Sequence, residues 1–164
     1  MDTELENKAA KFLRSKGLRL AIAESCTGGL IGHRVTNIPG SSTFYMGSIT
    51  AYAYEAKVRA LGIKWRTLEK HGAVSDEVVG EMALGVRRAL AADIGLSVSG
   101  IAGPGGGTEE KPVGLVYFGL SDAQGTLTTH KNFEGDRVKI KEQAADFALA
   151  YLLTHLAEKL DGTD

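Results

Sequence analysis

Apolar residues recur along this chain at two different spacings, and the spacing predicts which element forms at each place. Near the N-terminus, Leu5, Ala9 and Leu13 fall at helical spacing, which predicts an amphipathic helix. The run "LRLAIA", residues 18–23, is short, mostly apolar and bounded by polar residues. Such a run is typical of a buried strand, which here would end at about Glu24.

The same patterns predict the remaining elements. A capping hydroxyl at Ser75, followed by two acids, marks the start of one helix, and Gly17 and Gly62 are expected to stop two others. Apolar segments on either side of "AQG" favour a β-hairpin late in the chain. Further helices are expected at 28–38, 54–62, 65–70, 75–92 and from about 137 to 156. Strands are expected within 40–52, 94–103, 114–122 and 126–135.

Helices and strands alternate along most of the chain. This order favours a three-layer α/β/α sandwich, with a mostly parallel mixed sheet of about five strands and one antiparallel strand. A length of 164 residues fits a single domain over 1–164. In such sheets ligands bind outside the carboxyl ends of the strands. The loops after Ala23, around 52–57 and after Ile101 leave those ends, so we expect a site where they meet.

The overall composition narrows the class of protein. A formal net charge of −1 gives no electrostatic basis for binding nucleic acid. No apolar run approaches the ~20 residues that span a bilayer, and the acidic, amphipathic N-terminus is unlike a signal peptide. Cys26 is the only cysteine, so no internal disulfide can form. These features predict a soluble cytoplasmic protein that binds neither nucleic acid nor a membrane.

The segment "AESCTGG" combines several reactive side chains with glycines. Ser25 is expected where a strand turns into a helix, and the N–H groups of Thr27, Gly28 and Gly29 behind it are suited to an oxyanion or a phosphate. Other interpretations stay open at this point. Ser25 or Thr27 would cap the helix, and Cys26 would be either a rival nucleophile or a small buried apolar side chain. The G-x-S-x-G motif of α/β-hydrolases is absent.

A serine nucleophile needs a base. The four histidines have no carboxylate at a recognisable spacing, so a Ser-His-Asp triad gains no support, and they form no metal-binding pattern. Lys57 is expected in the first turn of a short helix, after a strand that ends near Ser25. The helix dipole and partial burial would lower the pKa of Lys57 toward the range of a general base. The competing interpretation is an ordinary solvated lysine.

A second glycine-rich segment, "GIAGPGGGTEEKPVG", follows the strand predicted at 94–103. Its backbone could bind an anion and Lys111 would add a positive charge, although no Walker G-K-[ST] occurs. The glycines concerned are Gly103, Gly105, Gly106 and Gly107. Arg137, at the start of the last helix, could clamp a phosphate or a carboxylate. The competing interpretations are a long flexible turn and an exposed arginine paired with Asp136.

Six separated motifs occur in one order over nearly the whole chain. They are "AESCTGG", "GSS", "YxxEAK", "LxxHGAVS", "SGIAGPGGGTEEKPVG" and "F-x-GDR". In this combination the chain resembles the C-terminal domain of the CinA competence/damage-inducible protein family, a domain that also exists alone as nicotinamide-nucleotide amidase. The resemblance implies a three-layer α/β/α fold with a mixed sheet, in agreement with the order of the predicted elements.

The resemblance also implies a reaction. It is the hydrolysis of the carboxamide of nicotinamide mononucleotide to nicotinate mononucleotide and ammonia, with no metal or organic cofactor. Matched by motif, Ser25 is the nucleophile, Lys57 is the base, and Tyr52 is a third catalytic residue that relays a proton or holds the lysine. Arg137 would bind the substrate phosphate or orient the substrate. The other substrate-binding residues implied by the motifs are Thr27, Gly28, Gly29, Ser42, Gly103, Gly105, Gly106, Thr108 and Lys111.

One motif departs from the family pattern. Y-S-N-E-[AV]-K is usual in the family, and Ala53-Tyr54 stands here in place of the Ser-Asn pair. If that Asn carries a hydrogen bond, its loss would change activity or specificity. Two alternatives to the amidase therefore stay open, a nucleotide-binding regulatory module without turnover and a serine amidase for another small amide. The amphipathic helices expected at the two ends of the chain would pack either on the core or on a partner subunit. A homo-oligomer (dimer or higher) is therefore one of the expected states of the protein.

Overall fold

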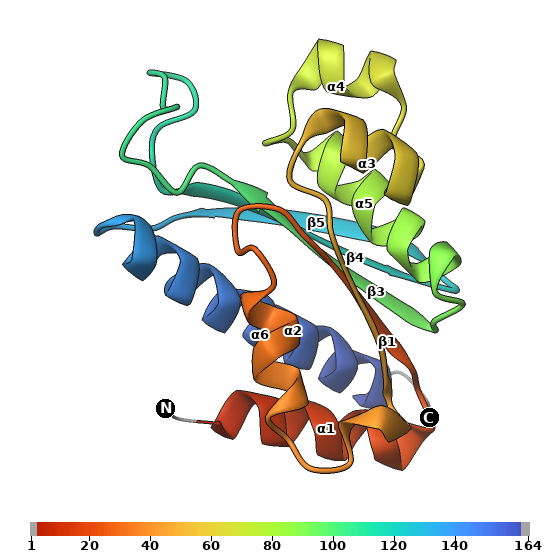
Figure 1. The fold of residues 1–164 in the computed structure, drawn as a ribbon. Coiled ribbons are helices and arrows are strands. Elements are labelled where there is room, and N and C mark those ends of the chain that lie inside the picture. The colour runs from red at the N-terminus through yellow and green to blue at the C-terminus, as the bar shows by residue number, and fades with distance from the viewer. Residues whose placement is uncertain (1–2, 162–164) are drawn as a thin grey trace.

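Figure 1 shows helices on both faces of a central sheet, in a computed structural model that describes residues 3–161. The strands are β1 (Leu20–Glu24), β2 (Tyr45–Thr50), β3 (Ile94–Gly100), β4 (Leu115–Asp122) and β5 (Gly125–Asn132). The helices are α1 (Glu4–Lys16), α2 (Leu30–Thr36), the short 3-10 helix η1 (Ser41–Thr43), α3 (Tyr54–Leu61), α4 (Trp65–His71), α5 (Asp76–Ala89) and α6 (Arg137–Asp161). The main elements follow the predicted order.

The strand order across the sheet is β2-β1-β3-β4-β5. β1 pairs in parallel with β2 and with β3, whereas β4 pairs antiparallel with β3 and with β5. Only β4 therefore runs against the other strands of this sheet, which confirms the predicted mixed sheet with one antiparallel strand. Glu24 at the end of β1 lies opposite Thr50 of β2 and Val98 of β3. The carboxyl ends of three strands therefore meet at one edge.

The two faces of the sheet carry separate apolar cores. Helices α1, α2 and α6 cover one face, and α3, α4 and α5 cover the other (Figure 1). Strand β1 is buried along its whole length, with Leu20 and Ile22 in the first core and Ala21 and Ala23 in the second. A strand that is buried on both faces has to be apolar at successive positions, which explains why this run shows no alternation with polar residues.

Local signals set several helix ends where they were predicted. Gly17 closes α1 with a left-handed backbone (φ 65°), a conformation that glycine adopts without steric cost. Ser75 caps α5, because its Oγ accepts a backbone N–H of the first turn at 3.3 Å. The helix expected over 28–38 is shorter than predicted. It begins only at Leu30, because the two glycines before it form a turn.

The closing helix α6 spans 25 residues and buries one face in the first core. Its buried positions recur at helical spacing, as predicted, and include Ile140, Ala144, Ala148, Leu152 and Leu156. Among the helices of residues 3–161, none combines the length and the apolar character that crossing a membrane requires.

Asp122, at the end of β4, anchors the C-terminal part of α6. Its carboxylate accepts a hydrogen bond from His155 Nε2 at 2.8 Å and forms an ion pair with Lys159. Burial alone would raise the pKa of Asp122, but hydrogen bonds from Lys159, the Gln124 N–H and His155 outweigh burial and lower it to about 2. The folded state therefore favours the ionised carboxylate more than the unfolded state does.

Asp122→Asn is expected to lower the free energy of unfolding at neutral pH by about 2 kcal/mol, the equivalent of the fall in pKa. Because the folded pKa lies below the unfolded value, this stabilisation is complete above about pH 4 and is lost as the pH falls toward 2. Urea unfolding of both proteins across this pH range measures the difference, with the exposed Glu158→Gln as control. A difference that stayed constant from neutral to acid pH would contradict the ionic origin of the effect.

Candidate active site

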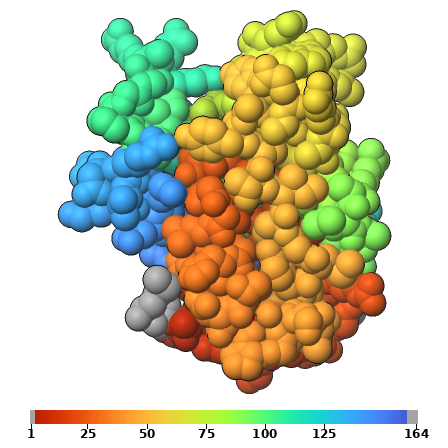
Figure 2. Space-filling model, in the orientation of Figure 1, coloured from red at the N-terminus to blue at the C-terminus, as the bar shows by residue number. Residues whose placement is uncertain are grey.

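Three segments meet at the edge of the sheet where β1, β2 and β3 end. They are residues 25–29 after β1, residues 51–53 after β2 and the long loop over 101–114 after β3. In Figure 2 the first turns of α6, in blue, lie beside the red-orange segment that follows β1. The loops that carry most of the candidate polar side chains therefore lie together at this edge.

Ser25 and Lys57 are in direct contact here. Ser25 follows β1, and its N–H donates to the Val98 carbonyl of β3 at 3.1 Å, which extends the parallel pairing by one residue. Lys57 lies in the first turn of α3, and its Nζ is 2.9 Å from Ser25 Oγ. The structure thus brings together the two side chains that the sequence indicates as nucleophile and base.

The Lys57 amine is surrounded by oxygen atoms and shielded from solvent. Besides Ser25 Oγ, Nζ contacts the carbonyl oxygens of Ala51 and Tyr52, each at 2.8 Å. The residue is 1% exposed, and within residues 3–161 it forms no ion pair with a carboxylate. Burial lowers the pKa of Lys57 from 10.5 to about 8. The interpretation of Lys57 as a solvated helix lysine is therefore wrong.

Glu24 is the last residue of β1, and the sequence analysis assigned it no role. It is 0% exposed, and its carboxylate accepts hydrogen bonds from Thr27 Oγ1 at 2.6 Å and from the N–H groups of Ile31 and Gly32 at 3.0 Å. Glu24 therefore supplies the acceptors for the start of α2, and the hydroxyl of Ser25 is not used as a cap. No local signal indicates this, because Glu24 ends β1 and lies six positions before the first residue of α2.

The backbone around Ser25 offers several free N–H groups. The Gly28 N–H donates to the Ser25 carbonyl at 3.1 Å, so it closes the turn and is not available to a ligand. In the part of the chain that the structure describes, the N–H groups of Thr27 and Gly29 donate to no backbone or side-chain acceptor. Two of the three predicted donors, at Thr27 and Gly29, are therefore free to bind a developing negative charge.

Cys26 lies beside Ser25 but belongs to the core. Its side chain is 6% exposed and packs with the apolar residues between the sheet and α6. Burial raises the pKa of the Cys26 thiol to about 11, so the thiol stays protonated near neutral pH. Since the thiolate is the reactive form, this environment favours Ser25 over Cys26 as the nucleophile.

Tyr52 and Arg137 form a bridge across the same edge. The phenol oxygen of Tyr52 accepts a hydrogen bond from Arg137 Nη2 at 3.1 Å, and Arg137 Nη1 donates to the Gly103 carbonyl at 2.6 Å. Tyr52 contacts Lys57 through its carbonyl, while its side chain is 61% exposed. Asp136 caps the N–H of Lys139 at 2.9 Å. The interpretation of Arg137 as the partner of Asp136 therefore finds no support in these contacts.

The rest of the glycine-rich loop extends away from Ser25. Thr108 and Lys111 hydrogen-bond each other, from Thr108 N–H to the Lys111 carbonyl at 2.8 Å and from Lys111 N–H to Thr108 Oγ1 at 3.0 Å. Lys111 Nζ donates to the His71 carbonyl at the end of α4. Gly105 and Gly106 are exposed. Of the predicted residues in this loop, only Gly103 is linked directly to the Tyr52–Arg137 bridge.

Ser42 lies at the opposite edge of the sheet. It belongs to η1, which precedes β2, and the Phe44 carbonyl that follows accepts the Leu20 N–H at the start of β1. Because β1 and β2 run parallel, the beginning of β2 is far from the edge where β1 ends. The structure therefore does not bring Ser42 to the residues around Ser25, although the motif "GSS" had suggested it.

The histidines and acids form no second catalytic centre at this edge. His155 does pair with Asp122, but Asp122 ends β4 at the sheet edge opposite Ser25. The His155–Asp122 pair is therefore too far away to serve Ser25, whose Oγ contacts Lys57 Nζ. Among residues 3–161 there is also no group of three or more His, Cys, Asp or Glu side chains placed to hold a metal ion.

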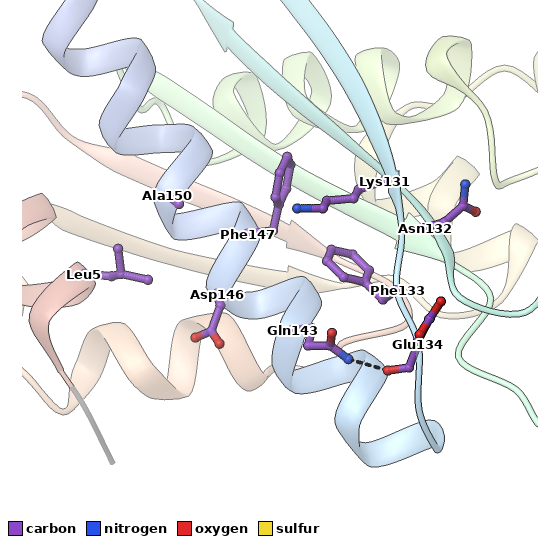
Figure 3. A pocket seen from close by; sticks show the side chains of 9 residues that line it. All are labelled: Leu5, Lys131, Asn132, Phe133, Glu134, Gln143, Asp146, Phe147 and Ala150. Atoms are coloured by element: carbon purple, nitrogen blue, oxygen red, sulfur yellow. Dashed lines mark hydrogen bonds between the residues drawn. The ribbon is translucent and has the colours of Figure 1, made fainter.

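One surface cavity, of about 530 Å³, lies between the end of β5 and α6 (Figure 3). Lys131 Nζ lies 5.2 Å from the centre of the Phe147 ring there, and Gln143 donates to the Glu134 carbonyl at 2.7 Å. The cavity contains neither Ser25 nor Lys57. Its lining combines an exposed lysine with aromatic rings and includes no serine, cysteine or threonine, so we place the chemistry at the strand ends and not in this cavity.

Comparisons of sequence with known proteins agree on one family. The model of the CinA C-terminal domain matches residues 2–156. A relative from Halothermothrix orenii is 53% identical over 156 residues, which are 94% of this chain and 38% of the relative. The CinA-like protein of Kosmotoga olearia is 49% identical over 151 residues, 92% of this chain and 37% of the relative. This chain therefore spans less than two fifths of the length of those relatives.

Solved structures agree with this result. The crystal structure of a competence-damaged protein (CinA) superfamily protein from Klebsiella pneumoniae matches with a TM-score of 0.92 and 36% identity, over 96% of this chain and 99% of that one. The competence or damage-inducible protein from Enterobacter asburiae matches with a TM-score of 0.90 and 40% identity, over 94% and 97% of the two chains. Both structural similarities cover nearly the whole of this chain.

Proposed function

The chain belongs to the CinA C-terminal domain family, and on this basis we propose that it hydrolyses the carboxamide of nicotinamide mononucleotide with a Ser25–Lys57 dyad. The observation that carries the proposal is the 2.9 Å contact between Lys57 Nζ and Ser25 Oγ in a site largely shielded from solvent. A serine beside a lysine of lowered pKa is suited to acyl transfer. The nucleotide substrate is inferred from the resemblance of the motifs.

The three contacts of Lys57 Nζ suit a neutral amine that acts as a base. An ammonium has three N–H groups, one for each of the oxygens of Ser25, Ala51 and Tyr52. After loss of one proton, two N–H groups remain for the two carbonyls, and the lone pair faces the Ser25 hydroxyl. The carbonyls therefore orient the lone pair toward the proton that has to be removed.

The first half of the reaction forms an acyl-enzyme. Lys57 takes the proton of Ser25 while Oγ attacks the amide carbon, and the free N–H groups of the loop after Ser25 stabilise the oxyanion. When the tetrahedral intermediate collapses, the carbon–nitrogen bond breaks and Lys57 returns the proton to the leaving nitrogen. Ammonia leaves, and the nicotinoyl group remains esterified to Ser25.

The second half uses water in the same way. Neutral Lys57 removes a proton from a water molecule that attacks the ester, and then protonates Ser25 Oγ as the carbon–oxygen bond breaks. The products are nicotinate mononucleotide and the free enzyme. Every proton in this sequence is carried by Ser25, Lys57 or water, so the steps require no further titratable residue.

The substituted pair Ala53-Tyr54 lies at the start of α3 and leaves the dyad intact. Ala53 is the N-cap position and provides no side-chain cap, and the Tyr54 phenol accepts the Ala73 N–H at 3.2 Å. Tyr54 thus contacts the segment between α4 and α5, and Lys57 keeps its three oxygen contacts. This supports turnover in preference to a binding module that has lost it.

The test is ammonia release from nicotinamide mononucleotide by the purified native protein, with nicotinate mononucleotide followed by chromatography. Nicotinamide riboside, nicotinamide, asparagine and glutamine are assayed in parallel. We expect stoichiometric ammonia and nicotinate mononucleotide from the nucleotide. A thermal shift with the nucleotide but no ammonia at high enzyme concentration would indicate a binding module. Faster turnover of another amide would indicate a different amidase.

A further inference from the structure

Lys141 of α6 lies beside the loop that carries Ser25. A Cβ atom added to Gly28 would lie 3.8 Å from Lys141 Nζ, so the ammonium group lies against the backbone of this turn. Lys141 follows Arg137 by one helical turn and is half-buried. The two cationic side chains therefore extend from the same face of α6 toward the edge where β1, β2 and β3 end.

Neither cation has a carboxylate partner. Within residues 3–161, Lys141 forms no hydrogen bond or ion pair, and both bonds of Arg137 go to uncharged oxygens. The carboxylate of Glu24, at the end of β1, accepts hydrogen bonds from Thr27 Oγ1 and from two N–H groups at the start of α2. Asp136 accepts from the Lys139 N–H. An anionic ligand at this edge would meet two positive charges that no protein carboxylate neutralises.

This arrangement is unfavourable for the helix alone. Like charges four residues apart repel each other, and cations near the N-terminus of a helix oppose its dipole. The first turn of α6 contains no acidic residue, and the one carboxylate that caps it, that of Asp136, accepts the Lys139 N–H. A bound anion would relieve both, which is the situation expected of residues placed for a ligand.

The distance from Ser25 suits a substrate with separate amide and phosphate ends. The hydrogen bond from Gly28 N–H to the Ser25 carbonyl closes a turn, which keeps the two Cα atoms within about 7 Å of each other. A nicotinamide nucleotide carries its phosphate beyond a pyridine ring and a ribose. With the carboxamide at Ser25, the phosphate end would reach the far side of the turn, where Lys141 lies.

We propose that Lys141 binds the phosphate of the nucleotide substrate, together with Arg137, and so sets the preference for a phosphorylated substrate. The inference rests on the proposed function. A lysine ammonium is a point charge with three donors and can bind a phosphate oxygen from varied directions, whereas the Arg137 guanidinium is already oriented by Tyr52 and Gly103. Lys141 thereby acts on binding and not on the chemical step.

The kinetic test compares Lys141→Ala, Lys141→Arg and Lys139→Gln, which removes an exposed charge from the preceding turn. For nicotinamide mononucleotide, Lys141→Ala is expected to raise KM by about tenfold to a hundredfold, the effect of losing a charge-assisted hydrogen bond, with kcat within about twofold of native. Lys141→Arg should recover most of this loss, and Lys139→Gln should match native. For nicotinamide riboside, which has no phosphate, kcat/KM should be the same in all four proteins.

An unchanged KM for the mononucleotide in Lys141→Ala, or an equal loss with the riboside, would overturn the proposal. Binding of ribose 5-phosphate, measured by calorimetry, tests it without turnover. Native protein should bind this probe at least about tenfold more tightly than Lys141→Ala. If the native protein hydrolyses no amide but shows this difference, the amidase proposal fails and the phosphate site stands. If the native protein hydrolyses nicotinamide mononucleotide, but native protein and Lys141→Ala bind ribose 5-phosphate equally well, the amidase proposal stands and only the phosphate site is wrong.

Discussion

Ser25→Ala is expected to lower ammonia release from nicotinamide mononucleotide by roughly a thousandfold or more, because no acyl-enzyme can form without Oγ. The variant should remain folded, because Lys57 Nζ keeps the carbonyls of Ala51 and Tyr52 as acceptors. The change removes one small polar group that is 7% exposed, so little packing is lost. Steady-state ammonia assays, with circular dichroism and thermal unfolding on the same samples, measure both effects.

Two control variants test whether the loss of activity is specific to the Ser25 hydroxyl. Ser121→Ala removes a serine that is also buried, at 1% exposed, and that lies at the opposite edge of the sheet. Among residues 3–161 its Oγ has no hydrogen-bond partner. This variant should retain native activity. Cys26→Ala removes the neighbouring thiol and should keep most of the activity, since that thiol is protonated and packed in the core. Loss of turnover in Cys26→Ala together with its survival in Ser25→Ala would show that Cys26, and not Ser25, is the nucleophile.

The elements that the sequence predicts well are those set by neighbours along the chain. Gly17 closes α1 and Ser75 caps α5 because each acts on backbone groups a few residues away. The run at β1 is apolar throughout because both faces of a central strand are covered. From such signals the order of elements and the sandwich could be predicted. The contact of Ser25 with Lys57 then follows, since parallel strands end at the same edge.

Other parts of the site depend on contacts between distant segments, and the sequence does not show these. The motif "GSS" groups Ser42 with the site, yet Ser42 precedes β2 and so lies at the other edge. Glu24 turns inward to cap α2, which depends on how tightly the turn after Ser25 closes. The bond from Arg137 to Tyr52 joins residues 85 positions apart. Only the packing of α6 against the strand ends determines such contacts.

Lys57→Met is expected to lower kcat by about 10²–10⁴-fold, the contribution of a general base, while filling the buried space that the lysine side chain leaves. The pH profile of the native protein tests the same role. The neutral amine is the competent form and the pKa of Lys57 is lowered to about 8 by burial. Activity should therefore rise about tenfold per pH unit below 8 and level off above it. Lys70→Met, on the exposed end of α4, should keep native rate and profile.

A substrate-independent measurement separates the role of Lys57 from the proposed reaction. Because the folded pKa of Lys57 lies below its unfolded value of 10.5, the unfolded state binds the extra proton between about pH 8 and 10.5. Native stability should therefore increase with pH across this window, by up to about 3 kcal/mol, and Lys57→Met should lack this increase. Equal pH dependence in both proteins would mean that the buried amine is charged in the folded state. In that case Lys57 would hold Ser25 in place without serving as its base.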